Sequence, residues 1–76
     1  MKKIIKKQVI VLKEVFENKG RMTYKEVAES SGLTWKQVES ASRDLVRRRL
    51  FIKPKRGVVE INKAVIPRII DVIARG

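Results

Sequence analysis

Hydrophobic residues recur along the chain with a spacing that changes from helical to strand-like and back. In the first segment they fall three or four residues apart, at Ile5, Val9, Leu12 and Phe16. The same reading along the chain predicts five elements in order: helices over residues 3–18, 23–31 and 34–49, a β-hairpin over residues 50–61, and a helix over residues 64–75. The pattern therefore predicts a single domain that is mainly α with one small β-hairpin.

The second and third predicted helices are separated by a very short turn. Each begins with a threonine followed three residues later by Glu26 or Gln37, which is the pattern of a capping box. Gly32 lies between them and can adopt the left-handed conformation that ends a helix. Two helices joined this tightly must cross at a steep angle, so one of them is expected to be presented to a partner.

Proline and glycine mark the two later elements. Pro54 and Gly57 suit the tip of a hairpin, because proline presets the first turn angle and glycine accepts a positive φ. Pro67 is expected in the first turn of the last helix, where its missing amide is not needed.

The charge of the chain favours a polyanionic partner. Nineteen Lys and Arg against eight acidic residues give a net charge of +11, which would repel itself on so small a body. The alternatives are a merely solvated surface or the Lys- and Glu-rich composition of a thermophile. The uncharged run near the start of the chain, residues 8–12, is too short for the apolar core of a signal peptide. No transmembrane segment is predicted either. We therefore expect a cytoplasmic protein without a membrane partner.

The residues around the short turn resemble a known family. The spacing of Ala28, Gly32, Leu33, Val38 and Ala41 resembles the helix-turn-helix of DNA-binding proteins. With the basic hairpin after it, the chain looks like a winged helix-turn-helix domain, similar to small bacterial, archaeal and viral transcriptional regulators. The resemblance covers most of residues 21–61 and implies binding to double-stranded DNA.

In that family the third helix enters the major groove and its outward face touches bases. The outward residues here are Trp35, Lys36, Glu39, Ser40 and Arg43. Lys36 and Arg43 can donate to guanine, and Glu39 can accept from cytosine. Glu39 can equally pair with Arg43 one turn away. Trp35 has three possible roles, namely core packing, a nucleic-acid contact and a contact with a protein partner.

Contacts with DNA phosphates require only a cationic or hydrogen-bonding side chain long enough to reach the DNA backbone. The resemblance places the tip of the wing on the DNA backbone, and the ends of neighbouring helices can grip the flanking strands. The expected backbone contacts are Tyr24, Lys25, Arg47, Arg48, Lys53, Lys55 and Arg56.

The terminal helices carry more apolar residues than one covered face requires. This excess favours a homodimer, with an interface expected at Ile4, Ile10, Val11, Ile66, Ile69, Ile70 and Ile73. Two-fold symmetry would then place two third helices in successive major grooves of a pseudo-palindromic site. The alternative is that both helices cover the core of a compact monomer.

These features predict a sequence-specific regulator of transcription, most simply a repressor that covers a promoter. The alternative is an interaction or nucleoprotein-architecture module that binds DNA or RNA without sequence preference, or binds protein. The chain has no histidine or cysteine and no glycine-rich phosphate loop, so we expect neither an enzyme nor a metal or cofactor. A domain this small is also not expected to hold a small-molecule effector.

Overall fold

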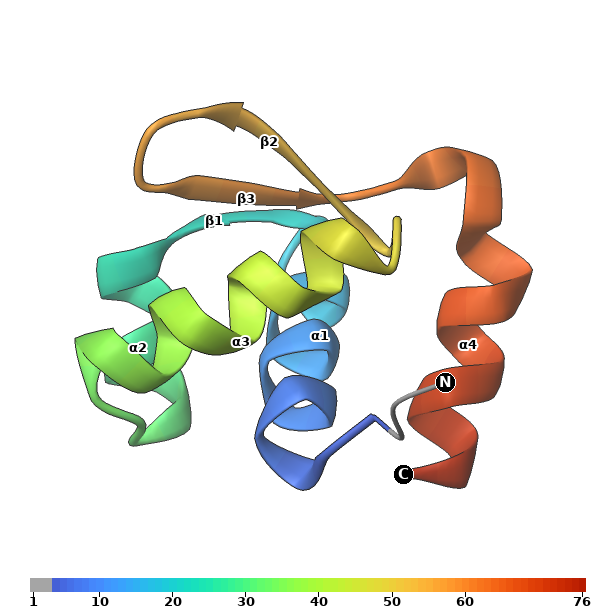
Figure 1. Cartoon of the computed structure of the whole chain (residues 1–76), viewed down its shortest axis with the longest axis horizontal. Helices are drawn as coiled ribbons and strands as arrows, with labels where there is room; N and C mark the ends of the chain where they lie inside the picture. The colour runs from blue at the N-terminus through green and yellow to red at the C-terminus, as the bar shows by residue number, and fades with distance from the viewer. Residues whose placement is uncertain (1–3) are drawn as a thin grey trace.

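The computed structural model describes residues 4–76 and is mainly helical, with a small antiparallel sheet (Figure 1). The elements follow in the expected order, with one additional strand. They are α1 (Lys6–Glu17), β1 (Arg21–Thr23), α2 (Tyr24–Ser31), α3 (Trp35–Arg47), β2 (Phe51–Lys55), β3 (Val58–Ile61), the 3-10 turn η1 (Lys63–Val65) and α4 (Ile66–Arg75).

Helices α1 and α3 have ends that differ from the prediction. The first helix was expected from residue 3, which lies outside the described residues, and α1 begins at Lys6. Helix α3 ends two residues before the expected position because Arg49 has a φ of 63°, in the left-handed region. The amide of Leu50 then donates to the carbonyl of Leu45 at 3.0 Å, which closes the helix. Pro67 lies in the first turn of α4, as expected.

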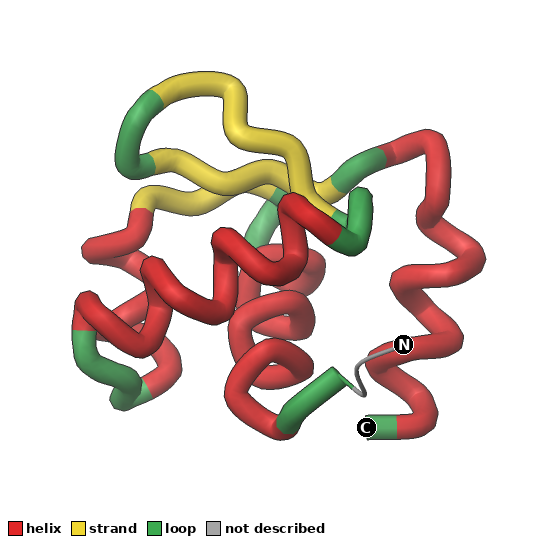
Figure 2. Tube along the Cα trace, in the orientation of Figure 1, coloured by secondary structure: helices red, strands yellow, loops and turns green. Residues whose placement is uncertain are grey.

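The hairpin is part of a three-stranded sheet with the order β1-β3-β2, which the sequence reading did not predict (Figure 2). Strand β1 is only three residues long and pairs antiparallel with β3, so that Met22 lies opposite Val59. The register of β2 and β3 shifts between Ile52 and Lys55, where Pro54 lies. Proline cannot donate to a ladder, so this edge position is where a strand tolerates it.

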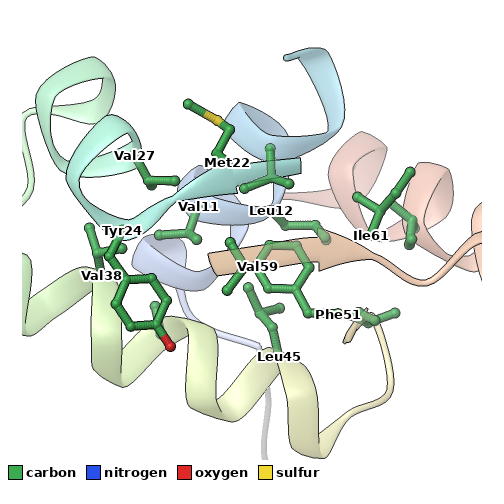
Figure 3. Close-up of a cluster of buried hydrophobic side chains, with 14 residues drawn as sticks. Val11, Leu12, Met22, Tyr24, Val27, Val38, Leu45, Phe51, Val59 and Ile61 are labelled. Atoms are coloured by element: carbon green, nitrogen blue, oxygen red, sulfur yellow. The ribbon is translucent and has the colours of Figure 1, made fainter. Parts of the chain in front are cut away.

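One core is shared by the sheet and all four α-helices. Figure 3 shows side chains from α1, α2, α3 and the three strands converging on it. Its large fully buried side chains include Leu12, Leu45, Leu50, Phe51 and Ile69. Helix α4 packs mainly against α1 and contributes Ile69 as its one buried residue. Helices α1 and α2 and the sheet therefore form the body against which α3 packs, with one face of α3 left exposed.

The tip of the hairpin is tied to the start of α2. The amide of Tyr24 donates to the carbonyl of Gly57 at 2.9 Å, across the end of the β1–β3 ladder. Gly57 has a φ of 76°, as the hairpin turn requires. The hairpin, α2 and α3 are thus held in a defined relative position.

Candidate nucleic-acid interface

The turn between α2 and α3 has the local geometry that the sequence predicted. Thr23 and Thr34 each accept a hydrogen bond from the backbone amide three residues on, at 3.1 Å. Gly32 has a φ of 78° and donates its amide to Ala28, which ends α2. A side chain at this conformation would be strained, so the turn depends on glycine.

Helix α3 presents one face to solvent and buries the other. Val38, Ala41 and Leu45 are buried against the body of the molecule. On the opposite side, four exposed residues repeat at steps of four, three and four, so they lie along one line at about 100° per residue. This line, called the basic ridge below, consists of Lys36, Ser40, Arg43 and Arg47.

Acidic residues flank the basic ridge on both sides. Glu39 pairs with Arg43 at 3.5 Å, which is the intrahelical pair that the sequence allowed. Asp44 pairs with Arg47 at 3.6 Å on the other flank. Both pairs are solvent-exposed, so each stabilises the helix by less than about 1 kcal/mol. The arginines can therefore exchange these partners for other anions at low cost.

Trp35 and Tyr24 contact each other at the first turn of α3. Their ring centroids are 5.7 Å apart at an interplanar angle of 77°, an edge-to-face pair. Trp35 keeps 51% of its surface exposed, so it covers Tyr24 and still faces solvent. Tyr24 is only 5% exposed. The ring of Tyr24 therefore belongs to the core, its remaining surface lines the groove between α3 and β2, and the expected phosphate contact stays a prediction.

The hairpin contributes one cation beside the basic ridge, Lys53. Lys55 and Arg56, nearer the tip of the hairpin, are also exposed. The ammonium group of Lys53 lies 5.9 Å from the centre of the Tyr24 ring, within cation–π range. A groove of about 170 Å³ runs between α3 and β2, and its lining includes Arg43, Arg47 and Lys53 as well as Glu39 and Tyr24. Positive side chains from two separate elements thus meet along one groove.

The other expected backbone contacts occupy the margins of this face. Lys25 is exposed in the first turn of α2. Arg48 is the C-cap of α3 and is half-buried, between the exposed Arg47 and Arg49. The three arginines thus differ in exposure, and only Arg47 lies within α3.

Helix α1 supplies a residue pair that the sequence reading missed. Gln8 is 4% exposed, and its amide nitrogen donates to Asp44 of α3 at 2.8 Å. Its amide oxygen accepts from the backbone of Ile5 at 3.2 Å. Beside it, Lys7 lines a hollow that also includes Lys36 and Ser40 of the basic ridge. The sequence contained one indication of this role, because Gln8 is a polar residue beside the apolar stripe of the first helix.

The expected dimer interface is only partly exposed. Val11 and Ile69 are fully buried in the core of the chain, so their assignment to an interface is wrong. The remaining expected interface residues are half-buried, apart from Ile70 of α4, which is 51% exposed. Ile69 and Ile70 do point in different directions, as their spacing required.

One carboxyl group has a shifted pKa. The backbone amide and the hydroxyl of Thr23 lower the pKa of Glu26, because the capping box stabilises its charged form. Within residues 4–76, no cluster of acidic side chains is arranged to hold a metal ion. Across the same residues, no helix has the length and apolar character needed to cross a membrane.

No protein-family model, curated protein or solved structure matches this chain. The geometry of α3 and the hairpin is therefore the basis for a functional assignment.

Proposed function

We propose that this chain is a winged helix-turn-helix domain that binds double-stranded DNA with sequence preference and represses transcription. One observation carries the proposal: Arg43 and Arg47 of α3 and Lys53 of the hairpin line a single groove. A duplex offers a row of phosphates beside each major groove, so cations from two elements along one groove match its charge pattern.

The dimensions of α3 suit a major groove. Its 13 residues span about 20 Å, and the groove is about 12 Å wide and admits one helix. In this arrangement Lys36 and Arg43 donate to guanine and Ser40 contacts a neighbouring base. Glu39 leaves Arg43 to accept from cytosine. Trp35 uses its exposed surface against a sugar or a thymine methyl group.

The backbone contacts lie on both sides of α3. The cations assigned to phosphates are Lys25, Arg47, Arg48, Lys53, Lys55 and Arg56. If about six cations meet phosphates, the logarithm of the binding constant falls with the logarithm of salt concentration at a slope of about −5. A slope near zero would contradict the proposal, since the positive surface would then serve another purpose.

A homodimer formed through the last helix completes the proposal. Ile70 is exposed on α4, with Ile66 and Ile73 half-buried beside it. Packing this face on a second copy would bury them and bring two α3 helices onto one side. The two helices would then read half-sites about 34 Å apart in a pseudo-palindromic site. Light scattering gives the oligomeric state directly.

Selection from random duplexes at physiological salt tests the function. We expect one enriched sequence, and a preference over random DNA that Lys36→Ala/Arg43→Ala lowers about a hundredfold, since each base contact of this type is worth about 1–3 kcal/mol. The matched control is Lys13→Ala/Arg68→Ala, which removes the same charge from exposed positions on α1 and α4. We expect this control to retain the preference.

Two results would favour a different function. Equal loss of binding on every sequence would indicate an architectural nucleoprotein that binds DNA or RNA through charge alone. An absence of duplex binding even at low salt would indicate a protein-interaction module.

A further inference from the structure

A second hollow lies on the other side of the basic ridge, between the start of α1 and α3. Its volume is about 390 Å³, within the range of about 300–1,000 Å³ typical of small-molecule sites. It is lined by Ile5, Lys7 and Gln8 from the first helix and its cap, and by Lys36, Ser40 and Ala41 from α3, among others. Two of these residues, Lys36 and Ser40, belong to the basic ridge.

The wall of this cavity is fixed by the buried side chain of Gln8. Both ends of its amide are hydrogen-bonded, one to the backbone of Ile5 and the other to the carboxylate of Asp44. Asp44 is further engaged by Arg47. A hollow whose polar wall is already satisfied keeps its shape without a ligand, which lowers the cost of binding one.

The free groups around the cavity are of two kinds. Ile5 is 54% exposed, so an apolar surface at the rim is left uncovered, and the buried Ala41 borders the cavity from α3. Among residues 4–76, Lys7 and Lys36 form no ion pair with a carboxylate. The cavity thus combines an apolar wall with two unpaired ammonium groups.

We propose that this cavity binds a small amphipathic anion, with an apolar body against Ile5 and its anionic group between Lys7 and Lys36. A DNA phosphate is a weaker match, because a phosphate needs a surface cation and leaves the apolar wall uncovered. The site differs from the expectation that the domain holds no effector. That expectation rested on the small size of the domain and the lack of an additional ligand-sensing segment, whereas the cavity lies between the start of α1 and α3.

The position of the cavity gives the ligand a consequence for DNA. This step rests on the proposed function, because the bound anion would occupy Lys36 and Ser40 of the basic ridge. The ligand and a duplex therefore exclude each other, and the anion acts as a release signal.

Naphthalenesulfonate is a suitable probe, and naphthylmethylamine is its charge-inverted control. We expect the sulfonate to bind in a saturable manner without DNA, with amide NMR shifts concentrated at residues 5–8 and 34–44. We expect the amine to bind more weakly. Absence of saturable binding, or shifts located elsewhere, would overturn the proposal.

Neighbouring residues provide matched variants. Lys7→Gln is expected to raise the probe's dissociation constant by up to about fivefold, as for an exposed ion pair. Lys6→Gln, one residue earlier and outside the cavity, should have no effect. Ile5→Ser removes the apolar rim and is expected to weaken the probe about tenfold. Ile52→Gln alters another exposed isoleucine, on β2 and outside the cavity, and should leave probe binding unchanged.

The DNA measurements separate this proposal from the function on which it depends. Saturating probe should raise the apparent dissociation constant for the selected duplex, and a lack of competition would refute the release signal. If Lys7→Gln weakens DNA and leaves the probe unaffected, the hollow serves a DNA strand and the ligand site is wrong. If the probe binds as described and no duplex does, the cavity stands and the proposed function fails.

Discussion

Ile69 and Ile70 are adjacent on α4, and the structure assigns them opposite environments. Ile69 is fully buried and Ile70 is 51% exposed. Truncation of Ile69 to alanine removes buried carbon atoms at about 0.8 kcal/mol per methylene. With the cavity that remains, the cost is about 3 kcal/mol of unfolding free energy. For a chain of 76 residues, each kcal/mol corresponds to about 4–8 °C in Tm, so the Tm should fall by about 12–24 °C.

The same change at Ile70 should behave differently. At a protein concentration where the chain is monomeric, Ile70→Ala should change the unfolding free energy by less than about 0.5 kcal/mol. If a dimer forms through α4, the wild-type Tm rises with protein concentration, and Ile70→Ala should remove that rise.

Thermal unfolding followed by circular dichroism, over a range of protein concentrations, measures both variants. The reasoning is refuted if Ile69→Ala lowers the Tm by no more than Ile70→Ala at low concentration. That result would mean that α4 is not anchored by Ile69, and the buried position of this side chain would carry no stability.

Three further predictions concern local features. Ile5→Ser should raise the unfolding free energy by about 1 kcal/mol in chemical denaturation, because Ile5 is the N-cap of α1 and its side chain caps nothing. Arg49→Gly should also raise it, by about 1 kcal/mol, since the φ of 63° suits glycine and strains arginine; an unchanged or lower value would contradict this. The lowered pKa of Glu26 means that its contribution to stability is complete above the ordinary glutamate pKa and is lost as the pH falls through the lowered value. Glu26→Gln should therefore flatten the acid limb of a stability–pH curve, and a curve parallel to that of the wild type would exclude the effect.

The sequence was most informative where structure is decided within a few residues. The capping boxes at Thr23 and Thr34 and the left-handed Gly32 each depend on local hydrogen bonds and backbone freedom, and all three are present. The exposed face of α3 followed from the helical period alone, because the buried residues Val38 and Leu45 fix which side is outward.

The features that sequence reasoning missed depend on contacts between distant segments. Strand β1 has only Met22 buried and exists because β3 pairs with it. Tyr24 was expected to face a DNA strand from the start of the second helix, and its burial comes from the core cluster, with Trp35 in contact with its ring. Val11 lies on a helix that is apolar on several sides, so the pattern could not separate core from interface.

Helix α3 was extended too far for a related reason. Nothing in the local pattern distinguishes Arg49 from its neighbours as a residue with positive φ. The helix ends there because Leu50 turns back into the core, where it is 1% exposed. Its end is therefore set by tertiary packing rather than by a terminating glycine.

The hydrogen bond from the amide of Tyr24 to the carbonyl of Gly57 bears on how the protein meets a partner. A free hairpin would have to be ordered on binding, at about 0.5–1.5 kcal/mol for each long side chain that is immobilised. Here the hairpin backbone is already fastened to the start of α2 and paired with β1, so the backbone needs no further ordering on binding. The distance between the hairpin and α3 is thus preorganised. A partner whose surface does not match this distance cannot contact both elements at once.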